Sequence, residues 1–313
     1  MATDQQPVPA TGVYAALATP RRPNSTEADA AAMLDYLDAV VQAGVDGLVL
    51  FGSTGEFVHF ELAERMRVVS LAIRRSRVPV LVNVSHSTLA GSIDLAENAT
   101  DAGASGLLLM PPYFYRYPSD QIRRFYEDFL KLAEAPVPLY LYNLPCFTNP
   151  ISMGLARELL SSGSFAGIKD SSADSSLFEG LQSLKSSVPF QFLVGSERLY
   201  MQERLSGSDG IVSGVAAAIP ELIVATDRAI RNGDTARANH LNGRLLEFVK
   251  FVDRFPVGVV IKQAAVVRGW NLNQVAIPFD DDMSADVIAF HQWFRTWLPD
   301  VLAESGDTAA VRS

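Results

Sequence analysis

The sequence predicts a (β/α)8 TIM barrel followed by a helical C-terminal extension. Over residues 12–215, eight short apolar runs alternate with amphipathic segments, and no change in composition marks a domain boundary. Strands that alternate with helices predict a parallel sheet, and eight such units predict closure into a barrel. Residues 216–303 have a helical pattern throughout, and we expect the tails 1–11 and 304–313 to be disordered. An open, doubly wound sheet is the alternative, although no GxGxxG follows the first apolar run.

The predicted strands are apolar over most of their length, as are strands that a parallel sheet buries on both faces. We expect them at residues 13–19, 46–51, 78–84, 106–110, 139–142, 165–168, 190–194 and 210–213. Helix-start residues, apolar residues at helical spacing and terminal glycines predict the helices. We expect helices at residues 24–44, 62–75, 89–102, 119–133, 152–160 and 198–205, and in the extension at 220–232, 234–254, 257–268 and 284–303.

Composition restricts the classes of partner. A net charge of −9 and a pI near 5.0 argue against nucleic acid and against an anionic membrane surface. The single cysteine, Cys146, allows no intrachain disulfide, and the N-terminus has no signal-peptide pattern, so we expect a cytoplasmic protein. The four histidines show no spacing typical of metal sites. We therefore expect no metal and no other cofactor.

Lys169 is the first candidate catalytic residue. It follows the apolar run 165–168 and is one of five lysines in a chain with twenty-one arginines. The next residues, Asp170-Ser-Ser172, predict a helix N-cap before leucines at helical spacing, so Lys169 lies at the carboxyl end of a strand. A lysine with apolar neighbours can lose its proton there and attack a ketone to form a Schiff base. A surface lysine that caps a loop is the structural alternative.

Three other strand ends carry polar or aromatic groups. Gly52-Ser53-Thr54-Gly55 follows the second strand, where hydroxyls and backbone amides can bind a carboxylate, although an ordinary capped loop gives the same pattern. Tyr142 ends the fifth strand and shares one side of it with Tyr140, either as a proton carrier or as a core phenol. The aromatic run that begins at Tyr113 can line a pocket or fill a subunit interface.

Three motifs occur in order on separate strands: Gly52-Ser-Thr-Gly-Glu56, Tyr142-Asn-Leu-Pro145 and Gly167-Ile-Lys-Asp170. Together they resemble the dihydrodipicolinate synthase / N-acetylneuraminate lyase family of Schiff-base aldolases and lyases, over roughly residues 11–300. The resemblance implies a 2-keto acid substrate such as pyruvate, no cofactor, and a homo-oligomer, either a tetramer or a dimer. It also implies Lys169 and Tyr142 as catalytic residues, with substrate bound by Ser53, Thr54, Gly55, Val212, Phe147 and Tyr113.

Two departures from the family pattern bear on the substrate. Members that make dihydrodipicolinate have an arginine, which binds the second substrate's carboxylate, where this chain has Phe147. They also have a second tyrosine after the fourth strand, where this chain has Phe114, although the neighbouring Tyr115 and Arg116 offer a hydroxyl and a cation. Both departures favour cleavage of a 2-keto-3-deoxy sugar acid, or a related 4-hydroxy-2-keto acid, to pyruvate and an aldehyde.

Other functions stay open at this stage. One is 4-hydroxy-tetrahydrodipicolinate synthase, which joins pyruvate to aspartate semialdehyde, and another is a dehydratase of keto-deoxy sugar acids. A third is a non-catalytic barrel that binds a keto acid. Because a pure binder needs no amine and phenol together, the pairing of Lys169 with Tyr142 favours an enzyme.

Overall fold

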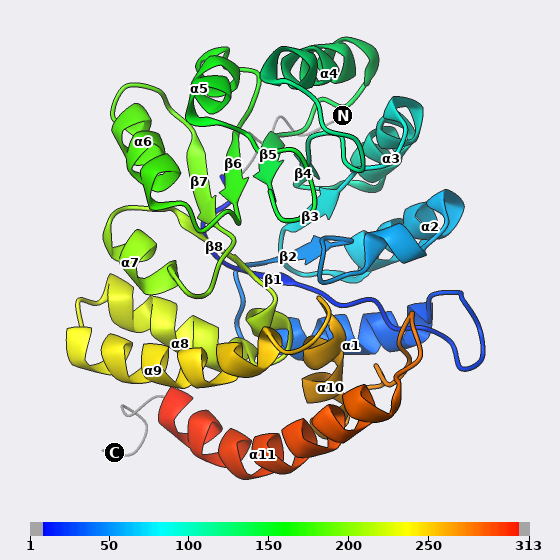
Figure 1. Cartoon of the computed structure of the whole chain (residues 1–313), viewed down its shortest axis with the longest axis vertical. Helices are drawn as coiled ribbons and strands as arrows, with labels where there is room; N and C mark the ends of the chain where they lie inside the picture. The colour runs from blue at the N-terminus through cyan, green and yellow to red at the C-terminus, as the bar shows by residue number, and fades with distance from the viewer. Residues whose placement is uncertain (1–8, 307–313) are drawn as a thin grey trace.

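The computed structural model describes residues 9–306 of the chain, and eight parallel strands in this part close into a barrel (Figure 1). The strands follow each other around the barrel in chain order, and β8 pairs with β1. They are β1 (Gly12–Ala16), β2 (Gly47–Leu50), β3 (Val80–Asn83), β4 (Gly106–Leu109), β5 (Leu139–Asn143), β6 (Gly167–Asp170), β7 (Gln191–Val194) and β8 (Gly210–Ser213). The predicted TIM barrel is confirmed, with strands where the apolar runs indicate them.

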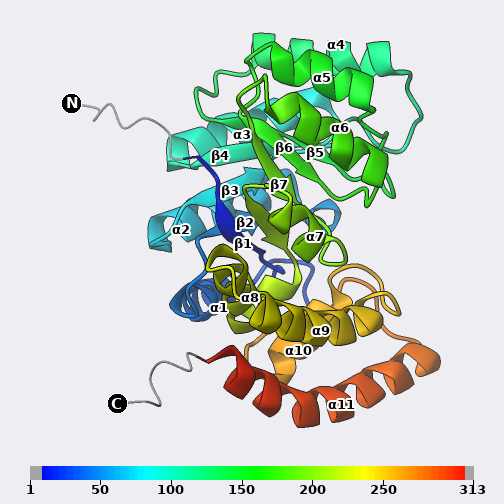
Figure 2. The ribbon, with the colours of Figure 1, turned by 90° about the vertical axis from the view of Figure 1, so that its left-hand side faces the viewer.

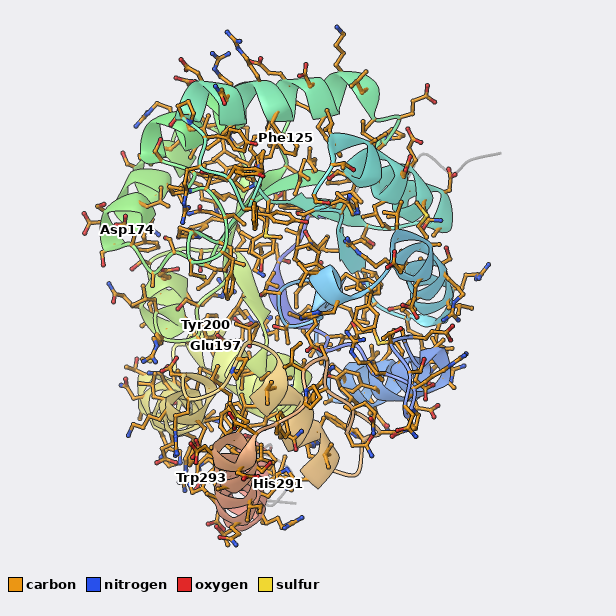
Figure 3. The ribbon with its side chains drawn as sticks, turned by 45° about the vertical axis from the view of Figure 1, so that its right-hand side comes forward. Phe125, Asp174, Glu197, Tyr200, His291 and Trp293 are labelled. Carbon is orange, nitrogen blue, oxygen red and sulfur yellow. The ribbon has the colours of Figure 1, made fainter. Side chains whose placement is uncertain are left out.

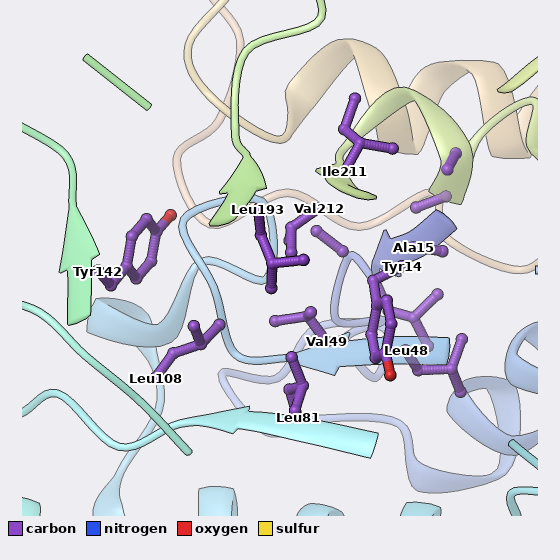
Figure 4. Packing of buried hydrophobic residues seen from close by; sticks show 14 of the residues in the cluster. Tyr14, Ala15, Leu48, Val49, Leu81, Leu108, Tyr142, Leu193, Ile211 and Val212 are labelled. Atoms are coloured by element: carbon purple, nitrogen blue, oxygen red, sulfur yellow. The ribbon is translucent and has the colours of Figure 1, made fainter. Parts of the chain in front are cut away.

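Side chains fill the interior of the barrel (Figure 4). Apart from the first residue of β7, every strand position is buried. Figure 4 shows Tyr142, Leu193 and Val212 in this interior, contributed by β5, β7 and β8. Tyr140, also on β5, is buried, and its hydroxyl accepts a hydrogen bond from the Ala10 amide at 3.3 Å. Tyr140 is therefore a core phenol with a satisfied hydroxyl.

Helices cover the outside of the barrel and continue beyond it (Figures 1 and 2). Around the barrel lie α1 (Ala30–Gln42), α2 (Leu62–Arg75), α3 (Leu89–Ala102), α4 (Ser119–Leu132), α5 (Met153–Ser161), α6 (Ser175–Lys185), α7 (Tyr200–Leu205) and α8 (Pro220–Arg231). There follow α9 (Thr235–Val252), α10 (Val259–Val267) and α11 (Asp281–Ser305), while the 3-10 turns η1 (Phe57–His59) and η2 (Val215–Ala217) come after β2 and β8. Within residues 9–306, none of the helices combines the length and apolarity that a membrane span requires.

Two helices begin later than the sequence patterns indicate. Asp29 is the N-cap of α1, and the predicted start at 24–27 lies in a turn and a bend instead. Asp174 is the N-cap of α6, although the sequence pointed to the segment that begins at Asp170. The reason is that the Asp170 carboxylate is buried and accepts a hydrogen bond from Asn143, so it is not available to the helix.

The C-terminal helices pack against one side of the barrel (Figure 2). α8 contacts β1, and α11 lies against α8, α9 and α10. Figure 3 marks Trp293 and His291 on α11. The Trp293 ring lies 4.3 Å from the ring of Phe251 on α9, and His291 Nε2 lies 2.9 Å from Gln263 Oε1 on α10. Aromatic packing, hydrogen bonds and the ion pair between Arg244 on α9 and Glu304 therefore join α11 to the helices beneath it.

The sequence also predicted a boundary between the barrel and the extension, and two terminal tails. The predicted division between residues 215 and 216 stays a prediction, since α8 lies beyond it and yet contacts β1. Residues 1–8 and 307–313 of the predicted tails lie outside the described residues. Of the described tail residues, Ala10 is buried and α11 continues to Ser305, while the expected disorder of the tails stays a prediction.

Glu203 is a buried carboxyl group on α7. It is 3% exposed and interacts with the charge of Asp170 at the end of β6. Desolvation, and to a smaller degree the Asp170 charge, raise the pKa of Glu203 from 4.5 to about 8. At neutral pH the folded protein therefore holds a proton that the unfolded chain releases.

The Glu203→Gln variant should show a weaker pH dependence of stability than the wild type. The contribution of neutral Glu203 to the free energy of unfolding is complete below about pH 4.5, and it is lost as the pH rises through about 8. Glutamine stays neutral, so the unfolding temperature of the variant should fall less between about pH 5 and 9. Thermal unfolding followed by circular dichroism measures this, with Glu179→Gln as an exposed control on α6. Parallel curves for wild type and Glu203→Gln would contradict the prediction.

Candidate active site

Lys169 lies at the carboxyl end of β6. Its Cα pairs in register with Tyr142 on β5 and with Leu193 on β7, and the residue is 4% exposed. Lys169 Nζ lies 3.9 Å from the centre of the Tyr142 ring. None of the ion pairs within residues 9–306 involves this amine. The amine is therefore held against the face of a phenol without a carboxylate to neutralise it.

Gly195 leaves the space that the Lys169 side chain occupies. A Cβ atom at Gly195 would lie 2.0 Å from Ser171 Oγ and 3.1 Å from Lys169 Cε. Any larger residue would therefore displace the stem of the lysine. In the sequence Gly195 is visible only as the end of a strand, and its contact with Lys169 appears in three dimensions.

Asp170 and Asn143 fix the ends of β6 and β5 relative to each other. Asn143 Nδ2 donates to Asp170 Oδ1 at 2.7 Å, and Asn143 Oδ1 accepts from the Ile151 amide at 2.9 Å. Burial raises the pKa of Asp170, while hydrogen bonds from Ser172 and Asn143 act in the opposite direction. Because side chains alternate along a strand, this pair lies on the opposite side of β6 and β5 from Lys169. The pair therefore supports the site from behind.

The Tyr142 hydroxyl reaches the loop that follows β2. Tyr142 is fully buried, and its Oη lies 3.2 Å from Ser53 Oγ, where either oxygen can donate. The phenol therefore connects Lys169, against its ring, with a serine hydroxyl at its tip. Such a phenol can carry a proton to or from a molecule bound between these groups.

The loop from Gly52 to Gly55 has a strained backbone at both ends. Phe51 and Glu56 have φ angles of 54° and 53°, in the left-handed region. This conformation costs a non-glycine residue about 1–3 kcal/mol and persists only where the surrounding structure holds it. Glu56 is held by an ion pair with Lys262.

Lys262, on α10, provides this contact from the C-terminal extension. The residue is 0% exposed, and its Nζ also donates to the Gln274 carbonyl at 3.2 Å. Burial lowers the pKa of Lys262, and the charge of Glu56 opposes that effect. Sequence analysis missed this lysine, because nothing in a helical pattern indicates a partner 206 residues away.

The remaining residues predicted to bind the carboxylate lie around this loop or below it. Thr54 is 8% exposed, and a Cβ atom at Gly214 would lie 3.0 Å from Thr54 Oγ1, so the glycine allows the loop to approach the end of β8. The Gly55 carbonyl accepts a hydrogen bond from Thr19 at 2.8 Å. Val212 is buried in the barrel interior (Figure 4). The Ser53 hydroxyl is thus near Tyr142 and the Thr54 hydroxyl is near Gly214, whereas Val212 forms part of the core.

Ser53 is one of the residues that line a pocket of about 540 Å³. Tyr113 and Phe147 line it, as the resemblance implies. Much of its wall comes from η1 and its flanks and from residues 256–283 of the extension: Glu56, Phe57, Val58, His59, Pro256, Val257, Val259, Val275, Ala276, Ile277, Pro278, Phe279, Asp280 and Met283. Sequence analysis treated the extension as packing and so missed its part in this wall.

Phe114, Tyr115, Arg116 and His86 do not line this pocket. Arg116 Nη1 donates to the Thr148 carbonyl at 2.8 Å. His86 lines a separate cavity of about 380 Å³. Phe114 and Tyr115 are 87% and 65% exposed, and their rings lie 4.9 Å apart.

The described residues contain no group of three or more histidine, cysteine, aspartate or glutamate side chains that could hold a metal ion. The Tyr142 phenol lies next to Lys169, and its hydroxyl contacts Ser53 Oγ in a glycine-bordered loop that also carries the Thr54 hydroxyl. These donors suit a carboxylate and a ketone oxygen.

Comparison with known proteins finds a matching family and similar relatives over most of the chain. A family model described as "Dihydrodipicolinate synthetase family" matches residues 9–285. A 4-hydroxy-tetrahydrodipicolinate synthase of Methanoculleus marisnigri is 29% identical over 276 residues, which cover 86% of this chain and 93% of that protein. The protein named "Probable 2-dehydro-3-deoxy-D-pentonate aldolase YjhH" of Escherichia coli is 32% identical over 225 residues, covering 70% of this chain and 74% of the relative.

A solved structure extends the comparison to the fold. The crystal structure of YagE, a prophage protein of the dihydrodipicolinic acid synthase family from E. coli K12, was obtained in complex with pyruvate. It aligns with a TM-score of 0.81 and 27% sequence identity, covering 91% of this chain and 98% of YagE. The similarity therefore extends over the barrel and most of the C-terminal helices.

Lys262→Met should destabilise the protein by about 3–5 kcal/mol, because the variant leaves the Glu56 carboxylate buried without its partner. The double variant Glu56→Gln/Lys262→Met should recover much of this loss. Denaturant unfolding measures both free energies, with Lys250→Met as an exposed control. If the double variant is as unstable as Lys262→Met, the ion pair does not account for the effect.

Proposed function

The chain belongs to the dihydrodipicolinate synthetase family, whose members are lyases, and we propose that it is a Schiff-base-forming class I aldolase. Its reaction is the reversible cleavage of a 4-hydroxy-2-keto acid to pyruvate and an aldehyde. A 2-keto-3-deoxy sugar acid is the first example to test, because relatives are named for such substrates. The proposal rests chiefly on the 3.9 Å contact between Lys169 Nζ and the ring of Tyr142, whose hydroxyl lies 3.2 Å from Ser53 Oγ.

Lys169 is the nucleophile in this proposal. Its neutral amine adds to the C2 ketone of the substrate, and loss of water gives an iminium ion. Tyr142 donates and accepts the protons of this step, since its ring lies against the lysine amine and its hydroxyl contacts Ser53. The hydroxyls of Ser53 and Thr54, with the amides of their loop, bind the substrate carboxylate and so fix the orientation of the ketone.

The iminium ion is the electron sink for carbon–carbon cleavage. A base removes the proton of the 4-hydroxyl group, the C3–C4 bond breaks, and its electron pair moves into the iminium to give an enamine and the free aldehyde. Protonation of the enamine at C3 and addition of water then release pyruvate and regenerate the Lys169 amine. Condensation follows the same steps in reverse.

Two other activities are weaker candidates. The identity with a 4-hydroxy-tetrahydrodipicolinate synthase favours condensation with aspartate semialdehyde. However, the apolar Phe147 lines the pocket, and Arg116 is bonded to a backbone carbonyl next to it, so neither is placed as a carboxylate anchor. A dehydratase would use the same imine, and pyruvate release separates it from an aldolase. A keto-acid-binding barrel without catalysis would show no turnover.

We also propose a homo-oligomer, a tetramer or a dimer, that acts in the cytoplasm. The exposed rings of Phe114 and Tyr115, side by side after β4, favour a subunit contact. The acidic composition and the single cysteine favour the cytoplasm. The ligand is a small 2-keto acid.

Borohydride reduction in the presence of pyruvate should attach the reduced adduct to a peptide that contains Lys169. Lys169→Ala should abolish this mass increase, because the variant has no amine at the end of β6. Lys131→Ala, which removes an exposed lysine of α4, is the matched control and should be trapped as well as the wild type. Equal trapping of Lys169→Ala would refute both the residue and the mechanism.

Tyr142→Phe should fold normally and lose about 10²–10⁴-fold in kcat, as expected when a general acid/base is removed. Tyr140→Phe is the matched control: it lies two residues earlier on β5, and its hydroxyl contacts Ala10 instead of the Ser53 loop. Steady-state pyruvate release and circular dichroism measure activity and folding. Comparable turnover in the two variants would make Tyr142 a structural residue.

A further inference from the structure

Exposed apolar side chains gather in the pocket of about 540 Å³ that Ser53 helps to line. Val58, Phe147, Val257 and Ile277 all line it and are 61%, 56%, 42% and 67% exposed. They come from η1, the β5–α5 loop and two segments of the extension. Large apolar side chains that gather at one concave place indicate a binding site for an apolar group.

Polar side chains are the minority in the same wall: Ser53, Glu56, His59, Tyr113, Thr148 and Asp280. Its titratable residues are Glu56, His59, Tyr113 and Asp280, and the described part of the wall includes no lysine or arginine. Glu56 is already paired with Lys262. The Asp280 carboxylate accepts a hydrogen bond from the first turn of α11 at 2.8 Å. A second carboxylate bound here would be left unpaired, at a cost of a few kcal/mol if water is excluded.

The pocket is placed to receive the part of the substrate beyond C3. Ser53, whose hydroxyl contacts Tyr142, and Leu144, two residues after Tyr142 in the chain, both line it. The pocket therefore adjoins the phenol beside which the imine forms, and it can receive a substituent on C4. Its volume of about 540 Å³ lies within the range typical of small-molecule sites. This volume is far larger than pyruvate alone requires.

On the basis of the proposed aldolase function, we propose that the aldehyde half of the substrate is apolar, an aromatic or branched aliphatic aldehyde. In the condensation direction, C3 of the pyruvate enamine forms a bond to the aldehyde carbon. The aldehyde oxygen takes a proton to become the 4-hydroxyl group, and water then hydrolyses the imine and releases the product. The ring or branched chain lies against Phe147, Val257 and Ile277.

The test compares pyruvate release from 4-hydroxy-2-oxo-4-phenylbutanoate and from 2-keto-3-deoxygluconate, using the full chain. We expect kcat/KM at least about tenfold higher for the phenyl compound, as is typical when an apolar group enters a matching pocket. Equal or faster turnover of the sugar acid, faster condensation with aspartate semialdehyde, or no turnover of the phenyl compound would each overturn the inference. Borohydride trapping with pyruvate separates this result from failure of the aldolase proposal, because a trapped enzyme still forms the imine.

Variants of the pocket wall test whether the preference for the phenyl compound depends on its apolar side chains. Ile277→Asp and Val257→Asp should each lower kcat/KM for the phenyl compound about tenfold or more, because they place a carboxylate against the ring. Ile288→Asp, at a similarly exposed isoleucine of α11 outside the pocket, should leave it unchanged. If the pocket variants alter the sedimentation coefficient and leave kcat/KM for the phenyl compound unchanged, the apolar wall is a contact between copies of the chain and the inference is wrong.

Discussion

Closure of the sheet between β8 and β1 is the constraint on which the site depends. Gly12 pairs with Gly210 at this seam, and a Cβ atom on Gly210 would lie 2.1 Å from the Gly12 carbonyl oxygen. No larger residue fits at position 210, so Gly210 allows the last strand to meet the first. Once the sheet is closed, the carboxyl ends of all strands face one opening. Ser53, Tyr142 and Lys169, distant in sequence, become neighbours for this reason.

The barrel alone does not complete the site. Strands β5 and β6 place the amine and the phenol, and their register is set by backbone hydrogen bonds that any barrel of this kind would form. The loop after β2, in contrast, has left-handed residues at both ends and is held by Lys262 from the extension. The extension also supplies much of the apolar wall. The proposed catalytic residues and the apolar wall thus come from different parts of the chain.

The sequence predicted the barrel, and it placed Lys169 and Tyr142 at the ends of two neighbouring strands, because both features depend on local patterns. The catalytic roles of the two residues stay predictions. A buried parallel strand is apolar along its length, and its last residues lie at the active face whatever else the chain does. The failures involve tertiary contacts. Asp170 looked like a helix cap, but burial beside Asn143 gives it another partner. The wall around Ile277 was not visible, since a helical pattern shows which face is apolar and not what that face contacts.

The ion pair between Glu56 and Lys262 has a consequence for the order in which the protein matures. Its two members are 206 residues apart, and all eight strands precede the lysine in the chain. During synthesis from the N-terminus, a ribosome-bound chain can therefore complete its sheet, with the amine and phenol in place, before the loop beside them is secured. The nascent barrel therefore has Lys169 in place early and the loop after β2 anchored late, so the candidate site is complete only when translation has passed α10.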